Sequence, residues 1–189
     1  MLITGGAGFI GANAAHHFLQ KGYEVRIFDN LSRSGSKKNL TWLKQQHKNG
    51  LEVIEGDVRY DQKKLEKAVR NVSLVLHLAA QVAVTTSVVN PREDFEINAA
   101  GTFNVLEAVR LHGNNPTFIY SSTNKVYGGL EDVAVTETPT NYEFTKLKNG
   151  VAEDQCLDFH SPYGCSKGTG DQYVRDYHRI YGLPTVVFR

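Results

Sequence analysis

The chain has few cysteines. Of its 189 residues only two are cysteines, Cys156 and Cys165. Their spacing does not match a zinc motif, and too few companion ligands accompany them for a metal site. We therefore expect two reduced thiols, no bound metal and a cytoplasmic location.

Long apolar runs and an excess of one charge are also missing. No run approaches the length of a membrane span, and the N-terminus has neither a basic flank nor a cleavable apolar segment, which argues against a signal peptide. The 21 Lys and Arg residues nearly balance the 20 Asp and Glu residues, for a net charge of +1. This balance disfavours nucleic acid as a partner. Hydrophobic residues at 41% and charged residues at 22% are typical of a globular protein of one domain.

Short apolar segments alternate with segments of helical periodicity along the chain. Strands are expected at residues 2–4, 23–29, 51–57, 73–80, 116–122 and 184–189. Helices are expected from the first glycines to Gly22 and at residues 37–48, 62–70, 92–112 and 162–181, with an irregular segment at 129–160. This alternation predicts an α/β fold, a doubly wound parallel sheet of the Rossmann type with helices on both faces.

Three glycines follow the first expected strand at every third position, Gly5, Gly8 and Gly11. Gly5 would permit a tight turn, Gly8 would let backbone amides reach a pyrophosphate, and Gly11 would let the helix pack closely. The helix N-terminus would then hold the anion. An ordinary strand–helix turn is the alternative. The acid that follows the second strand favours the dinucleotide site.

Two aspartates end the second and third expected strands. Asp29 would accept hydrogen bonds from the adenosine ribose and would repel a 2′-phosphate, which favours NAD over NADP. The alternative is that Asp29 is a solvent-exposed acid in a turn. Arg33, four residues later, could bind a 2′-phosphate, so NADP stays an alternative cofactor. Asp57 could bind the adenine amino group, or it could be a helix N-cap.

Tyr163 and Lys167 lie four residues apart and therefore share one face of the last expected helix. A nearby ammonium would lower the pKa of the phenol and let it act as a general base on a sugar hydroxyl. Thr123, at the end of the fifth strand, could hydrogen-bond the same hydroxyl. The alternative is that Tyr163 and Lys167 are two surface residues on a helix and that Thr123 is an N-cap or turn threonine.

Seven segments resemble the extended short-chain dehydrogenase/reductase family, the NAD-dependent sugar-nucleotide epimerases and dehydratases. They are "TGGAGFIG", "FDNLSR", "GDVR", "HLAAQ", "NAAGTFNVLEA", "SSTNKVYG" and "YGCSK". The resemblance implies Tyr163 as the base, Lys167 as its pKa partner and contact to the nicotinamide ribose, and Thr123 as the third catalytic residue. It also implies cofactor contacts at Gly5, Gly8, Phe9, Ile10, Gly11, Asp29, Asn30, Ser32, Asp57, Val58, Leu78, Ala79, Ala80, Gln81 and Asn98, besides Tyr163 and Lys167.

The resemblance implies a nucleotide-sugar epimerase that works by transient oxidation to a keto sugar. In the family's dehydratases an Asp-Glu pair follows the threonine, whereas this chain has Asn124 and Lys125, which cannot perform acid–base elimination. "QVAVTTSVVNPREDFEIN", "SSTNKVYG" and "LDFHSPYGCSKGTGDQY" resemble the CDP-sugar 2-epimerases within the family, and this resemblance implies a CDP-sugar epimerised at C2. A UDP-sugar 4-epimerase and a non-catalytic NAD-binding module are the alternatives.

Members of this family are longer, and their C-terminal part binds the nucleotide and the sugar. We therefore expect residues 1–189 to form the NAD-binding domain with the catalytic set, and most of the substrate-binding part to be absent. The complete protein is expected to be a homo-oligomer.

Overall fold

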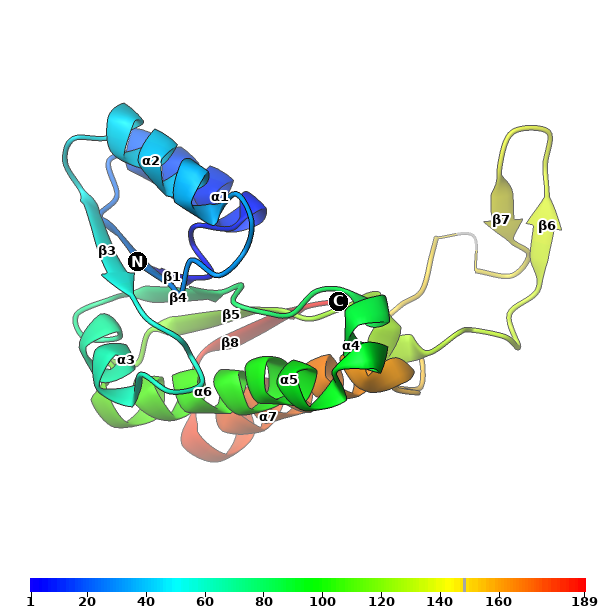
Figure 1. Cartoon of the computed structure of the whole chain (residues 1–189). Coiled ribbons are helices and arrows are strands. Elements are labelled where there is room, and N and C mark those ends of the chain that lie inside the picture. Colours follow the sequence, from blue (N-terminus) through cyan, green and yellow to red (C-terminus); the bar gives the residue numbers. More distant parts are fainter. Residues whose placement is uncertain (148) are drawn as a thin grey trace.

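A six-stranded parallel sheet forms the centre of the computed structural model, which describes residues 1–147 and 149–189 (Figure 1). The strand order is β3-β2-β1-β4-β5-β8. The strands are β1 (Leu2–Thr4), β2 (Val25–Asp29), β3 (Leu51–Glu55), β4 (Leu74–His77), β5 (Thr117–Ser121) and β8 (Thr185–Phe188). The doubly wound parallel sheet expected from the sequence is confirmed.

The order of the strands creates a crevice at one edge of the sheet. Thr4 of β1 pairs with Phe28 of β2 on one side and with His77 of β4 on the other. The chain winds outward in opposite directions from β1 and β4, so the loops that follow these two strands diverge. Ligands of such sheets bind at this point, beyond the carboxyl ends of the strands.

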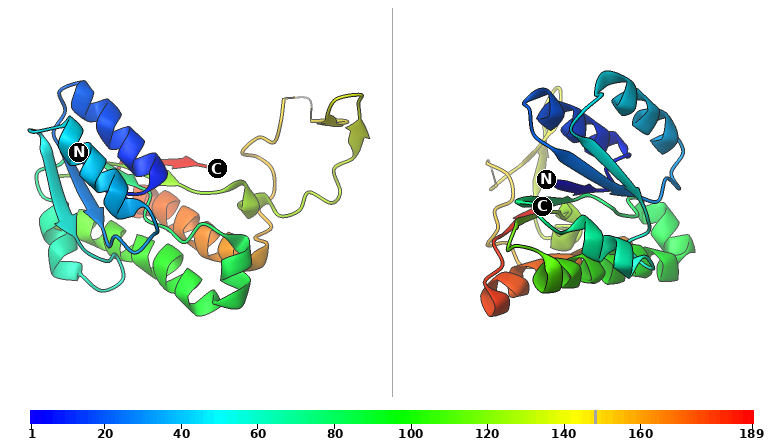
Figure 2. Two further views of the ribbon diagram at one scale, coloured as in Figure 1. Left: turned by 45° about the horizontal axis from the view of Figure 1, so that its top comes forward. Right: turned by 90° about the vertical axis from the view of Figure 1, so that its left-hand side faces the viewer.

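Helices cover both faces of the sheet, as Figure 2 shows. One layer consists of α1 (Phe9–Gln20) and α2 (Ser36–Gln46), and the other contains α3 (Gln62–Ala68), α6 (Gly101–His112) and α7 (Ser161–Tyr181). Ala15 and Leu43 pack with Ile27 in the first interface. Leu65, Leu106 and Val174 pack in the second, larger cluster. Burial of these apolar side chains is the main force that holds the layers together.

The long helix expected at residues 92–112 is present as three consecutive pieces. They are α5 (Pro91–Phe95), one π-helical turn (Glu96–Ala100) and α6. Asn90 caps α5 by accepting a hydrogen bond from the Glu93 N–H at 3.3 Å, and Pro91 occupies the first turn. A short preceding helix, α4 (Val84–Val89), was not expected.

Within the segment expected to be irregular, 129–160, residue 148 lies outside the described part of the chain. The expectation is wrong for one hairpin in this segment, β6 (Val135–Glu137) with β7 (Tyr142–Phe144). The portion around β6 and β7 projects away from the sheet (Figure 1). Within the described part of the chain, no helix combines the length and the apolarity needed to cross a membrane.

Candidate functional site

The glycine turn between β1 and α1 requires glycine at two places. Gly5 has a φ of +67°, and a Cβ there would lie 2.7 Å from the Ala79 backbone nitrogen. A Cβ on Gly11 would overlap the Gly5 carbonyl oxygen. The turn is closed by a 3.0 Å hydrogen bond from the Gly8 N–H to that same oxygen. These glycines are needed for the close approach of α1 to the sheet.

The N-terminus of α1 is open toward the crevice. Gly8 occupies the N-cap position and offers no side-chain cap, and the first turn contains no acidic residue. The free N–H groups and the helix dipole therefore make this end of the helix a suitable place for a phosphate. Phe9 and Ile10, 81% and 63% exposed, flank it.

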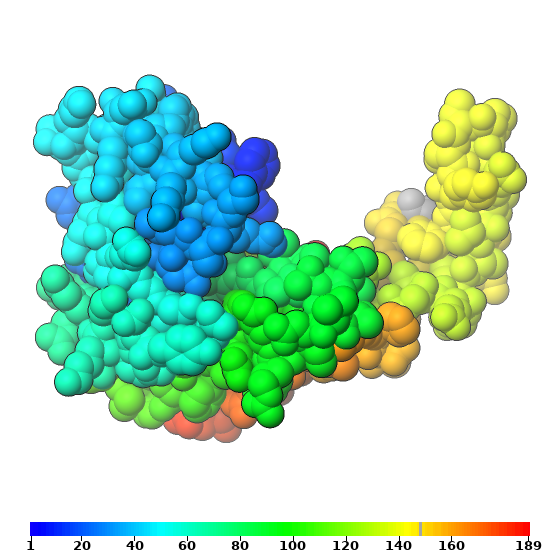
Figure 3. All heavy atoms as spheres, viewed as in Figure 1, coloured from blue at the N-terminus to red at the C-terminus, as the bar shows by residue number. Residues whose placement is uncertain are grey.

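A cleft of about 690 Å³ extends from the glycine turn to α7. Figure 3 shows the surface hollowed between the α1–α2 region in blue and the α4–α5 region in green. The cleft is lined by most of the residues expected to contact a cofactor: Gly5, Gly8, Phe9, Ile10, Gly11, Asp29, Asn30, Ser32, Asp57, Val58, Leu78, Ala79, Ala80, Tyr163 and Lys167. This size is within the usual range for small-molecule sites.

Asp29 lies in this cleft at the end of β2, and backbone donors fix its carboxylate. Oδ2 accepts a hydrogen bond from the Ala7 N–H at 2.9 Å, and Oδ1 accepts one from the Leu31 N–H at 2.8 Å. A carboxylate oxygen has a second lone pair, so both oxygens can still accept from ribose hydroxyls. Asp29 thus joins the glycine turn to the loop that follows β2.

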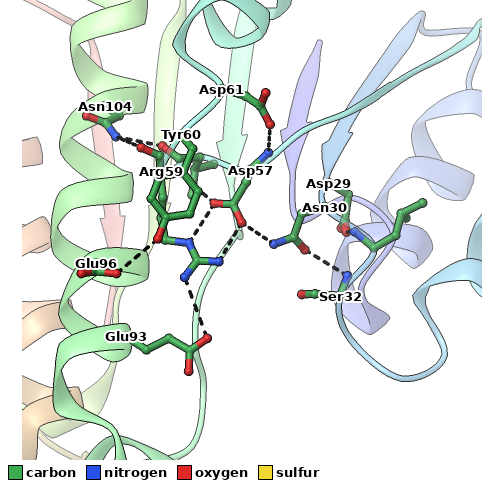
Figure 4. Close-up of polar contacts among 12 residues, drawn as sticks. Asp29, Asn30, Ser32, Asp57, Arg59, Tyr60, Asp61, Glu93, Glu96 and Asn104 are labelled. Carbon is green, nitrogen blue, oxygen red and sulfur yellow. Dashed lines mark hydrogen bonds and ion pairs between the residues drawn. The ribbon is translucent and has the colours of Figure 1, made fainter.

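Asp57 lines the same cleft as Asp29, and Arg59 holds its carboxylate by hydrogen bonds (Figure 4). Arg59 donates from Nε to Oδ1 at 3.0 Å and from Nη2 to Oδ2 at 2.9 Å, and Asn30 Nδ2 donates to Oδ2 at 2.8 Å. Burial alone would raise the pKa of Asp57, but these bonds and the Arg59 charge lower it to about 2. The N-cap alternative for Asp57 is wrong, because α3 is capped at Asp61.

Lys167 lies at the α7 side of the cleft and is only 4% exposed. Its ammonium donates to the Ser121 carbonyl oxygen at 2.6 Å and lies 4.2 Å from the centroid of the Tyr120 ring. Burial lowers the pKa of Lys167 to about 7, although the negative charges of Asp171 and Asp94 oppose this shift. The lysine therefore exchanges its proton near neutral pH.

Tyr163 is half-buried, one helical turn before Lys167 at the start of α7. Pro162 lies in the first turn of α7, and the Tyr163 N–H donates to the Ser87 hydroxyl of α4 at 3.1 Å. Because residues four apart share a helix face, Tyr163 and Lys167 both line the cleft. The fold brings this pair to the same crevice as the glycine turn.

Three expected site residues do not line the cleft. Thr123 caps the 3₁₀ turn Asn124–Tyr127, since its hydroxyl accepts from the Lys125 N–H at 3.2 Å, so the capping alternative describes its contacts. Gln81 and Asn98 are joined behind the cleft by a 2.9 Å hydrogen bond from the Gln81 N–H to Asn98 Oδ1.

A buried polar chain runs beneath the cleft. His77 contacts the Thr4 hydroxyl through Nδ1 at 2.6 Å and the Thr102 hydroxyl through Nε2 at 3.0 Å. The Thr102 hydroxyl donates to the Asn98 carbonyl oxygen at 2.6 Å. Burial lowers the pKa of His77 to about 3, and the Lys167 charge acts in the same direction.

The sequence analysis missed several residues that support this site. Arg59 was present only as a letter of "GDVR", and its spacing of two from Asp57 was the available signal. Asp171 of α7 is fully buried and accepts from Arg189 at 2.8 and 2.9 Å and from the Ser122 hydroxyl at 2.8 Å. No local pattern joins Arg189 to Asp171, so only the fold reveals this pair.

Comparisons with known proteins agree with this geometry. A family model described as GDP-mannose 4,6 dehydratase matches residues 2–189. The CDP-paratose 2-epimerase of Salmonella typhi is 51% identical over 190 residues, which covers 100% of this chain and 56% of that protein.

Two solved structures show the same fold. The UDP-glucose 4-epimerase of Thermus thermophilus in complex with NAD has a TM-score of 0.77 and 33% identity, covering 100% of this chain and 53% of that one. A dTDP-glucose 4,6-dehydratase double mutant of Streptomyces venezuelae with NAD bound has a TM-score of 0.81 and 30% identity, covering 98% of this chain and 53% of that one.

The chain spans about half the length of the curated relatives it matches. The match of the family model extends over almost all of the chain, and the glycine turn, the acid after β2 and the Tyr–Lys pair lie in one cleft. The chain therefore belongs to the GDP-mannose 4,6 dehydratase family, within the sugar-nucleotide epimerases and dehydratases of the extended short-chain dehydrogenase/reductase type.

Proposed function

We propose that this chain is the cofactor-binding and catalytic part of an NAD-dependent nucleotide-sugar epimerase. The observation that carries the proposal is the placement of Tyr163 and Lys167 in the cleft that begins at the glycine turn. A general base and its cation are thereby close to a site built for a dinucleotide.

The residues present fit NAD. The open N-terminus of α1 suits the pyrophosphate, and a Cβ at Gly5 or Gly11 would clash with the backbone around the turn that presents it. Asp29 suits the adenosine ribose hydroxyls, and its negative charge disfavours a 2′-phosphate. When bound, NAD would supply reversible hydride acceptance.

The chain's own residues would handle the proton. The Lys167 ammonium would stabilise the phenolate form of Tyr163, and this phenolate would take the proton of the sugar hydroxyl and become the neutral phenol. The bond from Lys167 to the Ser121 carbonyl oxygen fixes the ammonium in place. We propose that Thr123 binds the same hydroxyl, and that Gln81 and Asn98 support the cofactor from behind the cleft.

Dehydration is disfavoured by the residues after Thr123. Asn124 and Lys125 are both exposed at the start of the 3₁₀ turn. An amide and an ammonium cannot supply the carboxylic acid and the carboxylate base that elimination of water needs. The site is thus better suited to removal and return of a hydride at one carbon.

We propose a CDP-sugar as the substrate, epimerised at C2. The support is the 51% identity to a CDP-paratose 2-epimerase over the whole chain. The second candidate is 4-epimerisation of a UDP-sugar, supported by 34% identity to a putative UDP-glucose 4-epimerase of Methanocaldococcus jannaschii. We further propose that the complete protein is a homo-oligomer.

The test uses the complete enzyme with substrate deuterated at the carbon that is epimerised. Hydride transfer and return predict that the label stays on C2 of CDP-paratose, with no net NADH. Deuterium lost to solvent would indicate proton abstraction from carbon and would contradict the proposal. Retention at C4 of a UDP-hexose would select the second candidate. NAD binding without turnover of any CDP-, UDP- or dTDP-sugar would indicate a non-catalytic module.

A further inference from the structure

Asp94 of α5 is a fully buried carboxylate that the proposed chemistry does not use. Its Oδ1 accepts hydrogen bonds from Gln81 Nε2 at 3.0 Å and Asn98 Nδ2 at 3.2 Å, and its Oδ2 accepts one from the Ser166 hydroxyl. Every one of these donors is neutral. Burial raises the pKa of Asp94, and the hydrogen bonds from Ser166 and Gln81 and the Lys167 charge oppose this shift, so the ionised carboxylate is held here at a desolvation cost that calls for a functional reason.

Two of the three donors to Asp94, Gln81 and Ser166, come from the two segments that carry the candidate site, and the third, Asn98, lies on the π-helical turn. Gln81 directly follows residues 78–80, which line the cleft after β4. Ser166 lies between Tyr163 and Lys167 on α7, and its hydroxyl is also 3.1 Å from the Tyr163 carbonyl oxygen. Asp94 therefore joins the loop beside the cofactor site to the turn of α7 that carries the catalytic pair.

Among the described residues, no cation other than Lys167 acts on the negative charge of Asp94. The second buried aspartate in this region, Asp171, is matched by the bidentate Arg189. In residues 1–147 and 149–189, Asp94 forms no ion pair, and Lys167 is the cation whose charge acts on it. The negative charge of Asp171 on α7 also acts on Lys167, with a larger effect than that of Asp94, and the neutral His77 of β4 and Tyr120 of β5 lie beside the lysine.

We propose that Asp94 is a positioning residue for the Tyr163–Lys167 pair. Its carboxylate fixes Ser166, and with it the catalytic turn of α7, to the Gln81 loop, and its negative charge adds to that of Asp171 in favouring the ammonium form of Lys167. This inference rests on the proposed function, since it concerns the residues assigned to proton transfer there.

The effect of the Asp94 charge on Lys167 is tested by titrating Lys167 in this chain without any substrate. NMR of ¹³C- and ¹⁵N-labelled lysine gives the midpoint, and Lys167→Arg identifies the resonance. In Asp94→Asn the midpoint should move to lower pH by about half a unit or more, because a favourable charge is lost. Asp176→Asn removes the same charge from an exposed position on α7 and should leave the midpoint unchanged. An equal midpoint in wild type and Asp94→Asn would overturn the charge assignment.

The bridge is tested by amide hydrogen exchange over residues 163–167. Ser166→Ala removes the α7 end of the bridge and should raise exchange there about fivefold or more. Thr169→Val removes a different α7 hydroxyl, which donates to the Cys165 carbonyl oxygen, and should not raise the exchange rate. Unchanged exchange in Ser166→Ala would overturn the bridge, and this measurement decides alone if Asp94→Asn does not fold.

The outcome also separates this inference from the proposed function. In the complete enzyme, Asp94→Asn should narrow the pH range of turnover from its alkaline side, because Lys167 loses its proton at lower pH. A wild-type enzyme inactive on every nucleotide sugar would contradict the proposed function and leave the Lys167 titration valid. An active enzyme with an unshifted titration would contradict only the role of Asp94.

Discussion

At the scale of single residues, Asp29 has two tasks that one substitution can separate. Its carboxylate accepts a hydrogen bond from the Ala7 N–H of the glycine turn, and we propose that it also accepts from ribose hydroxyls. Asp29→Ala should weaken NAD binding by about 1–3 kcal/mol, since the hydroxyls lose a charged acceptor. NADP should be affected less, because the repulsion of its 2′-phosphate is also removed. Calorimetry with both cofactors measures this, and an equal loss for both would assign Asp29 a purely structural role.

The proposed function assigns the proton chemistry to Tyr163 and Lys167. Tyr163→Phe keeps the ring and removes the hydroxyl, so turnover by the complete enzyme should collapse while NAD still binds. Lys167→Ala should lower turnover and move the remaining pH optimum upward, because the phenolate loses its cation. Steady-state rates measured across neutral and alkaline pH report both effects. Near-normal turnover in Tyr163→Phe would contradict its role as the base.

At the scale of elements, the glycines between β1 and α1 have two different roles. Gly11 allows α1 to pack against the turn, and Gly8 leaves the N-terminus of α1 open to a phosphate. A Cβ on Gly11 would meet the Gly5 carbonyl oxygen, whereas a Cβ on Gly8 would lie 3.2 Å from the same atom. Gly11→Ala should therefore lower the free energy of unfolding by about 1–3 kcal/mol. Gly8→Ala should cost less stability but should still weaken NAD, because it covers the N-terminus of α1. Thermal unfolding and calorimetry on both variants distinguish the two, and equal stability losses would contradict the separate roles.

At the scale of the whole molecule, the core contains a histidine that must stay neutral. Its pKa of about 3 lies below the ordinary value of 6.5, so the unfolded chain binds a proton at His77 that the folded chain does not bind. The contribution of the neutral His77 to the free energy of unfolding is therefore fully present above pH 6.5, and it is lost as the pH falls toward 3. The loss from this group between about pH 7 and about pH 5 should be about 2 kcal/mol.

Urea unfolding at about pH 7 and about pH 5 measures this loss. His77→Gln keeps hydrogen-bonding groups beside Thr4 and Thr102 but does not titrate, so its stability should depend less on pH. His17 is exposed on α1, and His17→Gln is the matched control that should behave like wild type. Equal pH dependence in His77→Gln and wild type would show that His77 is not the group responsible.

Much of the fold could be read from the sequence because the information is local. Apolar strands alternate with helical periodicity, and glycines at every third position mark the β1–α1 turn. The spacing of four between Tyr163 and Lys167 places both on one helix face. The hairpin at residues 129–160 and the short helix α4 escaped prediction, because both lie in polar or irregular stretches without a clear period.

By itself the sequence determined the sheet, the dinucleotide turn and the candidate catalytic pair. Only the tertiary structure decided which groups stabilise them. Asp94 contacts Ser166 across 72 residues, and His77 contacts Thr4 across 73, so no pattern along the chain joins these partners. The parallel crossovers of the sheet bring them together, and burial then makes each hydrogen bond obligatory. The charges that act on Lys167 are thus a property of the folded core.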